Sequence, residues 1–221
     1  MDDFQNKLDY EKGCQQMADV FYKEHMNAIS IERYDWDDPE GRRMQKRDAD
    51  CKIVVKSDVN ENDFLHPIVI SEKFRSMDWG DMWIELYSRY PSVKGWALES
   101  QGVDLIAYFI DGLSAGIDKN IVYLVNAKRI KEFAENIVKQ FDNAVDIKIE
   151  LEKTGKYNAK YDYNGKQYDV IFRKVKTQRP TYSYDGVGVC IKWNDLKEMG
   201  VNITKKTSDI DMDDIDIFDL E

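Results

Sequence analysis

Two short β-branched segments bordered by acidic residues are the strongest constraint on how this 221-residue chain folds. Residues 49–55 run from Asp50 into Ile-Val-Val, and residues 67–75 run from Pro-Ile-Val-Ile into Glu72 and Lys73. Both compositions predict β-strands. If the two strands are neighbours, their charged ends converge on one rim of a sheet.

Hydrophobic patterning predicts the remaining elements. Further strands are expected at residues 82–88, 121–125, 147–151, 157–163, 168–175 and 190–193. Helices are expected at residues 12–29, 96–110, 127–141 and 195–199, with Asn126 and Asn194 as N-caps of the last two. Residues 32–47 are expected to be a loop and Asn164-Gly165 a hairpin turn.

The order of these elements predicts an α/β fold, a mixed β-sheet flanked by helices, with its first three strands as a meander. No stretch rich in Gly, Pro and Ser divides the chain, so residues 1–206 are expected to form a single domain. Residues 207–221 contain no basic residue and are expected to form a disordered acidic tail.

Composition narrows the classes of function. The sequence has no apolar run long enough to span a bilayer and an acidic N-terminus, so we expect a cytoplasmic protein without a membrane partner. Three scattered cysteines and two histidines disfavour a disulfide framework, a zinc hydrolase and a serine or cysteine hydrolase. Carboxylates and lysines remain as the expected carriers of any catalysis.

The formal net charge of −10 disfavours a nucleic-acid partner at first, because phosphate binding needs a basic surface. Seven of the acids lie from Asp209 onward, however, so the rest of the chain carries −10 + 7 = −3. A local basic groove therefore remains compatible with the sequence. The candidate phosphate-binding residues are Gln45, Lys46, Arg47 and Arg75.

The acidic strand ends predict a metal site. Carboxylates at Asp50 and Glu72, with Glu32 as a further candidate ligand, are suited to Mg²⁺ or Mn²⁺. Lys73 is placed to assist an attacking water and to stabilise charge on a phosphate. These parts suffice for metal-assisted hydrolysis of a phosphodiester. The simpler alternative is that charged residues at strand ends are only solvated.

Over about residues 19–108, the chain resembles the PD-(D/E)XK nuclease superfamily of bacterial and phage proteins. The resemblance implies a restriction-endonuclease-like fold, DNA as substrate, and catalysis by Asp50, Glu72 and Lys73. One position departs from the family pattern. A (D/E)-x-K motif needs an acid where this chain has Ser71, and the adjacent Glu72 and Lys73 point to opposite faces of a regular strand.

The acidic tail carries apolar residues that simple solvation does not require. Residues 214–218, Asp-Ile-Asp-Ile-Phe, look like the peptide with which bacterial replication proteins bind the sliding clamp, so Ile215, Ile217 and Phe218 are candidate partner-binding residues. The tail end is also similar to the tip of single-stranded-DNA-binding proteins. Other interpretations are a disordered tail without a partner and a tail that competes with DNA for a basic groove.

Two functions follow. The first is a Mg²⁺-dependent DNA nuclease, with the tail as its candidate recruitment segment. The alternative is a protein that keeps the nuclease fold without catalysis and acts through protein–protein interaction or DNA mimicry. Nothing in the sequence distinguishes DNA from RNA.

Overall fold

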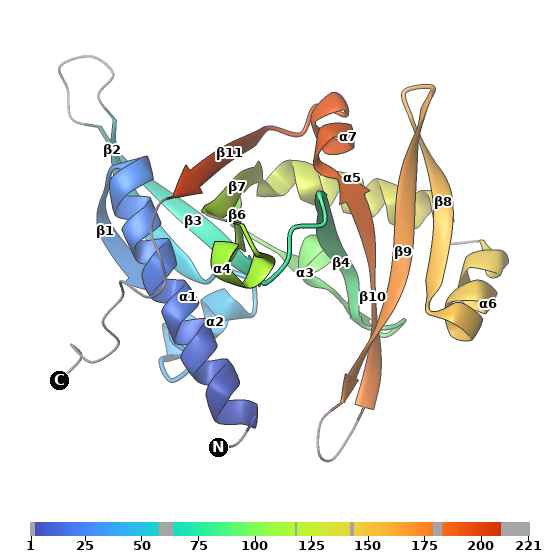
Figure 1. Ribbon diagram of the computed structural model, residues 1–221, viewed down its shortest axis with the longest axis horizontal. Coiled ribbons are helices and arrows are strands. Elements are labelled where there is room, and N and C mark those ends of the chain that lie inside the picture. Colours follow the sequence, from blue (N-terminus) through green and yellow to red (C-terminus); the bar gives the residue numbers. More distant parts are fainter. Residues whose placement is uncertain (1–2, 58–63, 118, 142–143, 179–182, 209–221) are drawn as a thin grey trace. The chain divides into compact units, whose positions relative to one another are not determined.

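The computed structural model describes residues 3–57, 64–117, 119–141, 144–178 and 183–208 (Figure 1). The chain forms two compact units, unit 1 (residues 1–78, 103–124 and 204–221) and unit 2 (residues 79–102 and 125–203). Its helices are α1 (Asp3–Met26), α2 (Pro39–Gln45), α3 (Trp96–Glu99), α4 (Gly112–Ala115), α5 (Ala127–Phe141), α6 (Val145–Thr154) and α7 (Trp193–Glu198). Among the described residues, no helix combines the length and the apolar character needed to cross a membrane.

The strands make two sheets, which confirms the α/β class. The first has the order β1 (Ala28–Arg33), β2 (Cys51–Ser57), β3 (Phe64–Arg75), β6 (Leu105–Ile110), β7 (Asn120–Asn126) and β11 (Ile203–Ser208). The second has the order β5 (Val93–Lys94), β4 (Asp81–Arg89), β10 (Ser183–Lys192), β9 (Lys166–Gln178) and β8 (Lys156–Tyr163). The single domain expected for residues 1–206 stays a prediction.

In unit 1, α1 covers one face of a mixed sheet (Figure 1). Strand β2 pairs antiparallel with both β1 and β3, and β6 pairs parallel with β3. Helix α1 contributes Met17, Ala18, Phe21 and Tyr22 to a core completed by Cys51, Ile53, Ile70, Ala107, Phe109 and Val122 of the sheet. On β3, the even-numbered residues therefore face α1 and the odd-numbered residues face away.

In unit 2, β5 pairs antiparallel with β4, β4 with β10, β10 with β9 and β9 with β8, and β8 and β9 form a hairpin. The hairpin turns at Asn164 and Gly165, whose φ angles of 52° and 77° are the left-handed values expected for this dipeptide. Helix α5 begins where predicted, and its N-cap Asn126 accepts a hydrogen bond from the backbone N–H of Arg129 (3.0 Å). The Phe133 ring of α5 packs edge-on against Tyr161 of β8, with centroids 5.3 Å apart.

Three predicted elements are wrong. The helix expected at residues 96–110 is the short α3 followed by β6, whose continuous apolar run is buried on both faces of the sheet. The strand expected at residues 147–151 lies in α6, which ends at the left-handed Gly155 (φ 71°). The three-strand meander is also wrong, since β4 belongs to the second sheet and not beside β3.

Two further predictions, the Asn194 N-cap and the loop at residues 32–47, also differ from the structure. Asn194 lies within α7, whose N-cap position is Lys192, although Gly200 ends this region in the predicted left-handed conformation (φ 84°). Residues 32–47 are not a plain loop, because they include the end of β1 and the whole of α2. Pro39 indicates a loop in the sequence, but it lies at the start of α2, where proline is favoured.

Helix α2 is fixed by its cap and by a close backbone approach. The Asp38 carboxylate accepts a hydrogen bond from the Gly41 N–H (2.6 Å), and Pro39 occupies the first turn. Gly41 is buried so tightly that a Cβ atom added to it would lie 1.9 Å from the backbone oxygen of Asp35. Only glycine fits this position without moving the backbone.

We therefore predict that Gly41→Ala lowers the free energy of unfolding by about 1–3 kcal/mol, the usual cost of an overpacked site. Arg42→Ala in the same helix is the control, with an expected change below about 0.5 kcal/mol because Arg42 is exposed. Urea denaturation of both variants measures the difference. Equal stability of the two variants would contradict the close packing of α2.

Candidate active site

Asp50 lies where β2 begins and continues the ladder between β2 and β3. Its N–H donates to the Ile70 oxygen (2.9 Å), and its own oxygen accepts from the Tyr34 N–H (3.0 Å). Cys51 pairs with Ile70, so the same register sets Asp50 opposite Ser71. The Asp50 carboxylate oxygen Oδ2 accepts the Glu72 N–H at 2.7 Å, which ties the side chain to the backbone of β3.

The carboxylate of Asp50 has a raised pKa. Burial is the main cause and lifts the pKa from 3.8 to about 6, while the charge of Lys73 and the hydrogen bond from the Glu72 N–H oppose the increase. The negative charges of Asp48 and Glu72 add to it. A buried acid whose pKa is shifted in this way, beside a lysine, is a common property of functional sites.

Asp48, Ser71 and Lys73 form a compact polar cluster on the face of β3 that points away from α1. The Ser71 hydroxyl donates to Asp48 Oδ2 (2.6 Å), and Lys73 Nζ donates to Asp48 Oδ1 (2.9 Å) and to Ser71 Oγ (2.7 Å). Ser71 is fully buried, whereas the Lys73 and Asp48 side chains keep 20% and 21% of their surface exposed. The ionic groups of the cluster therefore remain accessible.

A tight turn after α2 brings Asp48 into this cluster. Asp48 has a φ angle of 63°, in the left-handed region that Asp tolerates better than most residues. Its N–H donates to the Gln45 oxygen (3.0 Å) and the Ala49 N–H donates to the Met44 oxygen (3.1 Å), closing the end of the helix. From the sequence, Asp48 is expected to be a surface acid, because two acids so close together are costly as joint metal ligands; the lack of an acid at position 71 is the signal that points to it instead.

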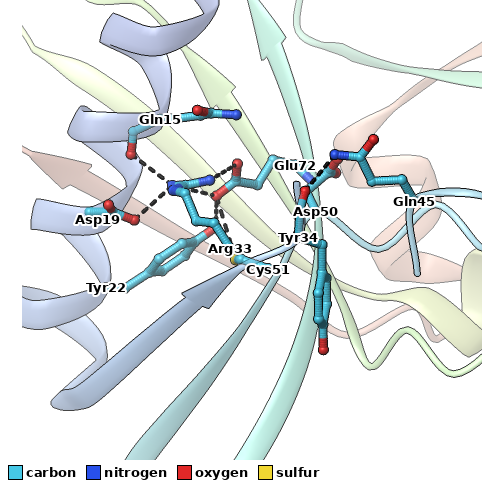
Figure 2. A network of polar contacts seen from close by, with 9 residues as sticks. All are labelled: Gln15, Asp19, Tyr22, Arg33, Tyr34, Gln45, Asp50, Cys51 and Glu72. Carbon is cyan, nitrogen blue, oxygen red and sulfur yellow. Dashed lines mark hydrogen bonds and ion pairs between the residues drawn. The ribbon is translucent and has the colours of Figure 1, made fainter. Parts of the chain in front are cut away.

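Glu72 points to the opposite face, toward α1. The register of β3 with β6 runs without a break from Ile70 to Arg75, so Glu72 and Lys73 alternate as on a regular strand. Figure 2 shows the Glu72 carboxylate turned toward Arg33 and Tyr22, away from Asp50. The expected convergence of Glu72 with Asp50 and Lys73 is therefore not observed; only its backbone N–H reaches Asp50.

The Glu72 carboxylate is saturated by a buried network. It accepts from the Tyr22 hydroxyl (2.9 Å), from Arg33 Nη1 (3.0 Å) and Nη2 (3.3 Å), and weakly from the Cys51 thiol (3.7 Å). Arg33 also donates to Asp19 Oδ1 (2.7 Å) in α1. The Glu72 side chain is only 2% exposed, so its charge depends on these donors.

The pKa values in this network follow from burial and from the Glu72 charge. Burial and then the nearby carboxylate raise the pKa of the Tyr22 hydroxyl and of the Cys51 thiol above their ordinary values, so both groups stay protonated donors. Burial alone would lower the pKa of Arg33, but Glu72 and Asp19 raise it above the ordinary value. Arg33 therefore remains charged.

The other predicted site residues have separate surroundings. Glu32 pairs with Lys52 on the surface of β1 and β2 and not with Asp50. Gln45 donates its side-chain amide to the Tyr34 oxygen (2.5 Å), and Arg75 lies over the Tyr108 ring, 5.2 Å from its centroid. Lys46 and Arg47 are exposed and directly precede Asp48 in the sequence. Ile215, Ile217 and Phe218 lie outside the described residues.

The three carboxylates of the predicted ligand set, Asp50, Glu72 and Glu32, have different partners in the structure. In the part of the chain that the structure describes, no group of three or more His, Cys, Asp or Glu side chains is arranged to hold a metal. Asp48 and Asp50 remain as a pair beside Lys73. Two carboxylates suit Mg²⁺, which commonly keeps several waters and takes further oxygens from a phosphate substrate.

We predict that Asp50→Asn stabilises the protein at neutral pH. The native pKa of about 6 lies above the ordinary value of 3.8, so the native state binds this proton more tightly and stability falls as pH rises from about 4 to about 6. The variant should gain about 2–3 kcal/mol in free energy of unfolding at pH 7.5 and lose the gain by pH 4. Urea denaturation across pH 4–8 measures this, with the exposed Asp37→Asn as control. An Asp50→Asn variant less stable than wild type at pH 7.5 contradicts the assignment.

We also predict that Arg33→Met lowers the free energy of unfolding by about 3–5 kcal/mol, because it leaves the buried Glu72 carboxylate without its cation. Arg33→Met combined with Glu72→Gln should recover at least about 2 kcal/mol of this loss, since the unpaired charge is gone. Lys52→Met removes the partner of the exposed Glu32 and should cost less than about 1 kcal/mol. Additive effects of the Arg33 and Glu72 substitutions would argue against the ion pair.

Comparison with known proteins finds no relative: no family model, no curated protein and no solved structure matches this chain. The chemistry of the cluster is therefore the ground for assigning it a function.

Proposed function

We propose that the chain is a metal-dependent DNA nuclease with a restriction-endonuclease-like core, in which Asp48 takes the place of the missing acid at position 71. The observation that carries the proposal is the grouping of Asp48, Asp50 and Lys73 around Ser71. The order of elements in unit 1 supports it as well. Helix α1 carries Asp19, Asp50 directly precedes β2 and Lys73 lies in β3, and members of the superfamily likewise have an acid on a helix, then an aspartate at a strand, then a lysine in the next strand.

Each residue of the cluster has a role in this proposal. Asp48 and Asp50 would hold Mg²⁺ or Mn²⁺, which supplies an activated water and positive charge for the phosphate. The Lys73 ammonium lies beside these carboxylates and stabilises negative charge that develops on a phosphate oxygen. The Ser71 hydroxyl orients Asp48 through its hydrogen bond. Asp50, with a pKa of about 6, is ionised above neutral pH, where its charge is needed.

One observation favours the alternative, a nuclease-fold protein without catalysis. The cluster is internally satisfied, since Lys73 and Asp48 neutralise each other and Ser71 stands where the family has an acid. Such a protein would act by interaction with other proteins or as a DNA mimic. Binding of the acidic tail to a sliding clamp is compatible with either function and stays a prediction.

We predict that the wild-type protein cleaves plasmid or single-stranded DNA with Mg²⁺ or Mn²⁺ in a gel assay. Asp48→Asn, Asp50→Asn and Lys73→Met should each reduce the rate roughly 100-fold or more, because each removes a group of the proposed site. Glu72→Gln should reduce it by about tenfold or less, because that side chain acts only through the position of its backbone.

Titration of Mn²⁺ followed by its electron paramagnetic resonance signal provides a second readout on the same variants. Loss of Mn²⁺ binding in Asp48→Asn and Asp50→Asn, but not in Glu72→Gln, supports the ligand pair. A folded wild-type protein that neither binds Mn²⁺ nor cleaves DNA refutes the nuclease and leaves the non-catalytic alternative.

A further inference from the structure

Helix α2 and the residue pair that follows it carry the densest basic run of the chain. Residues 42–47, Arg-Arg-Met-Gln-Lys-Arg, hold four basic residues in six, a density that no other six-residue window reaches. All four basic side chains are exposed. We call this set, Arg42, Arg43, Lys46 and Arg47, the α2 ridge.

The ridge is one continuous surface. Lys46 keeps a helical conformation (φ −63°, ψ −17°), and the Arg47 N–H donates to the Met44 oxygen (2.9 Å), so the helical turn continues through both. At about 100° per residue, the four basic positions fall within an arc of roughly 140° on the helix. Gly41 packs against the Asp35 backbone, which fixes this helix and its charges on unit 1.

Three of the four ridge charges have no ion-pair partner in the part of the chain that the structure describes. Arg43 pairs with Glu40, whereas Arg42, Lys46 and Arg47 make no ion pair with a described residue. The acids that precede the ridge lie on its N-terminal side: Asp35, Asp37, Asp38 and Glu40. A bound polyanion is therefore repelled from the start of α2 and attracted to its end.

The end of the ridge leads into the candidate site. Arg47 is followed by Asp48, whose N–H bonds to the Gln45 oxygen, and Ala49 bonds to the Met44 oxygen. A phosphate chain lying on the ridge would thus continue toward the Asp48–Lys73 pair. The only side-chain amide on this segment, Gln45, donates to the Tyr34 backbone and is already engaged.

We propose that the α2 ridge binds successive phosphates of a nucleic-acid backbone and guides the strand to the Asp48–Asp50–Lys73 cluster without reading its bases. The inference rests on the proposed function for the identity of the polyanion. Long, exposed basic side chains give contacts with phosphates that depend on charge and not on base sequence. The whole chain carries a net charge of −10, so a polyanion needs a local basic surface, and the α2 ridge offers one.

Binding to the full chain is measured by fluorescence anisotropy with labelled oligonucleotides in EDTA, which separates binding from hydrolysis. The probes are duplex DNA, single-stranded DNA and single-stranded RNA of matched length and two unrelated base sequences. Arg42→Gln, Lys46→Gln and Arg47→Gln are combined in one ridge variant. The matched control combines Lys148→Gln, Lys153→Gln and Lys197→Gln, three exposed lysines of α6 and α7 with the same change in net charge.

The ridge variant should bind at least about tenfold more weakly at 0.1 M salt. The slope of log affinity against log salt is negative, and its magnitude should decrease by about 3, one for each phosphate contact removed. The control should bind within about twofold of wild type, and the two base sequences should bind alike. The probe class that shows the largest loss identifies the nucleic acid.

A charge-preserving variant, Arg42→Lys with Lys46→Arg and Arg47→Lys, guards against a folding effect and should keep wild-type affinity. Equal affinity of the ridge variant and wild type, or equal loss in the control, overturns the inference. No binding of any probe by wild type overturns it as well. Ridge-dependent binding without metal-dependent cleavage would refute the nuclease while leaving the ridge standing.

Discussion

The hydrogen-bonded ion pair between Arg33 and Glu72 is the interaction on which unit 1 depends. Arg33 ends the edge strand β1, reaches Asp19 in α1 and meets Glu72 in β3, so one guanidinium joins a helix and two strands (Figure 2). A buried pair of this kind contributes little beyond its desolvation cost, but a single missing partner is expensive. The pair therefore enforces one arrangement of α1 on the sheet more than it adds stability.

Glu72 couples this structural network to the polar cluster on the other face of β3. Glu72 offers its carboxylate to Arg33 and its N–H to Asp50. Asp50 is consequently held in a buried position where ionisation is unfavourable, as its pKa of about 6 indicates. Buried acids in this condition lower stability, and proteins commonly retain them where activity needs a poised charge.

Local sequence chemistry predicted the elements whose signals are unambiguous. The β-branched runs of β2 and β3, the Asn164-Gly165 turn and the Asn126 cap each have one favoured conformation, and the structure has them. The helix prediction for residues 105–110 is wrong because a continuous apolar run suits a buried strand and a buried helix equally. The pairing of this segment with β3, which makes it a strand, is not visible in the local sequence. Residues 147–151 alternate like a strand, yet they are helical in α6, which ends at Gly155.

The residues of the candidate site also fall into those that the local sequence predicts and those that tertiary packing places. The period of a strand correctly separates Glu72 from Lys73, and that separation alone argues against Glu72 as a ligand. Asp48 depends instead on a left-handed turn after α2, whose formation requires Gly41 to pack on Asp35 and Asp38 to cap the helix. A site that uses a turn of this kind is set by tertiary packing, so a motif in a single strand can locate its lysine but not its second carboxylate.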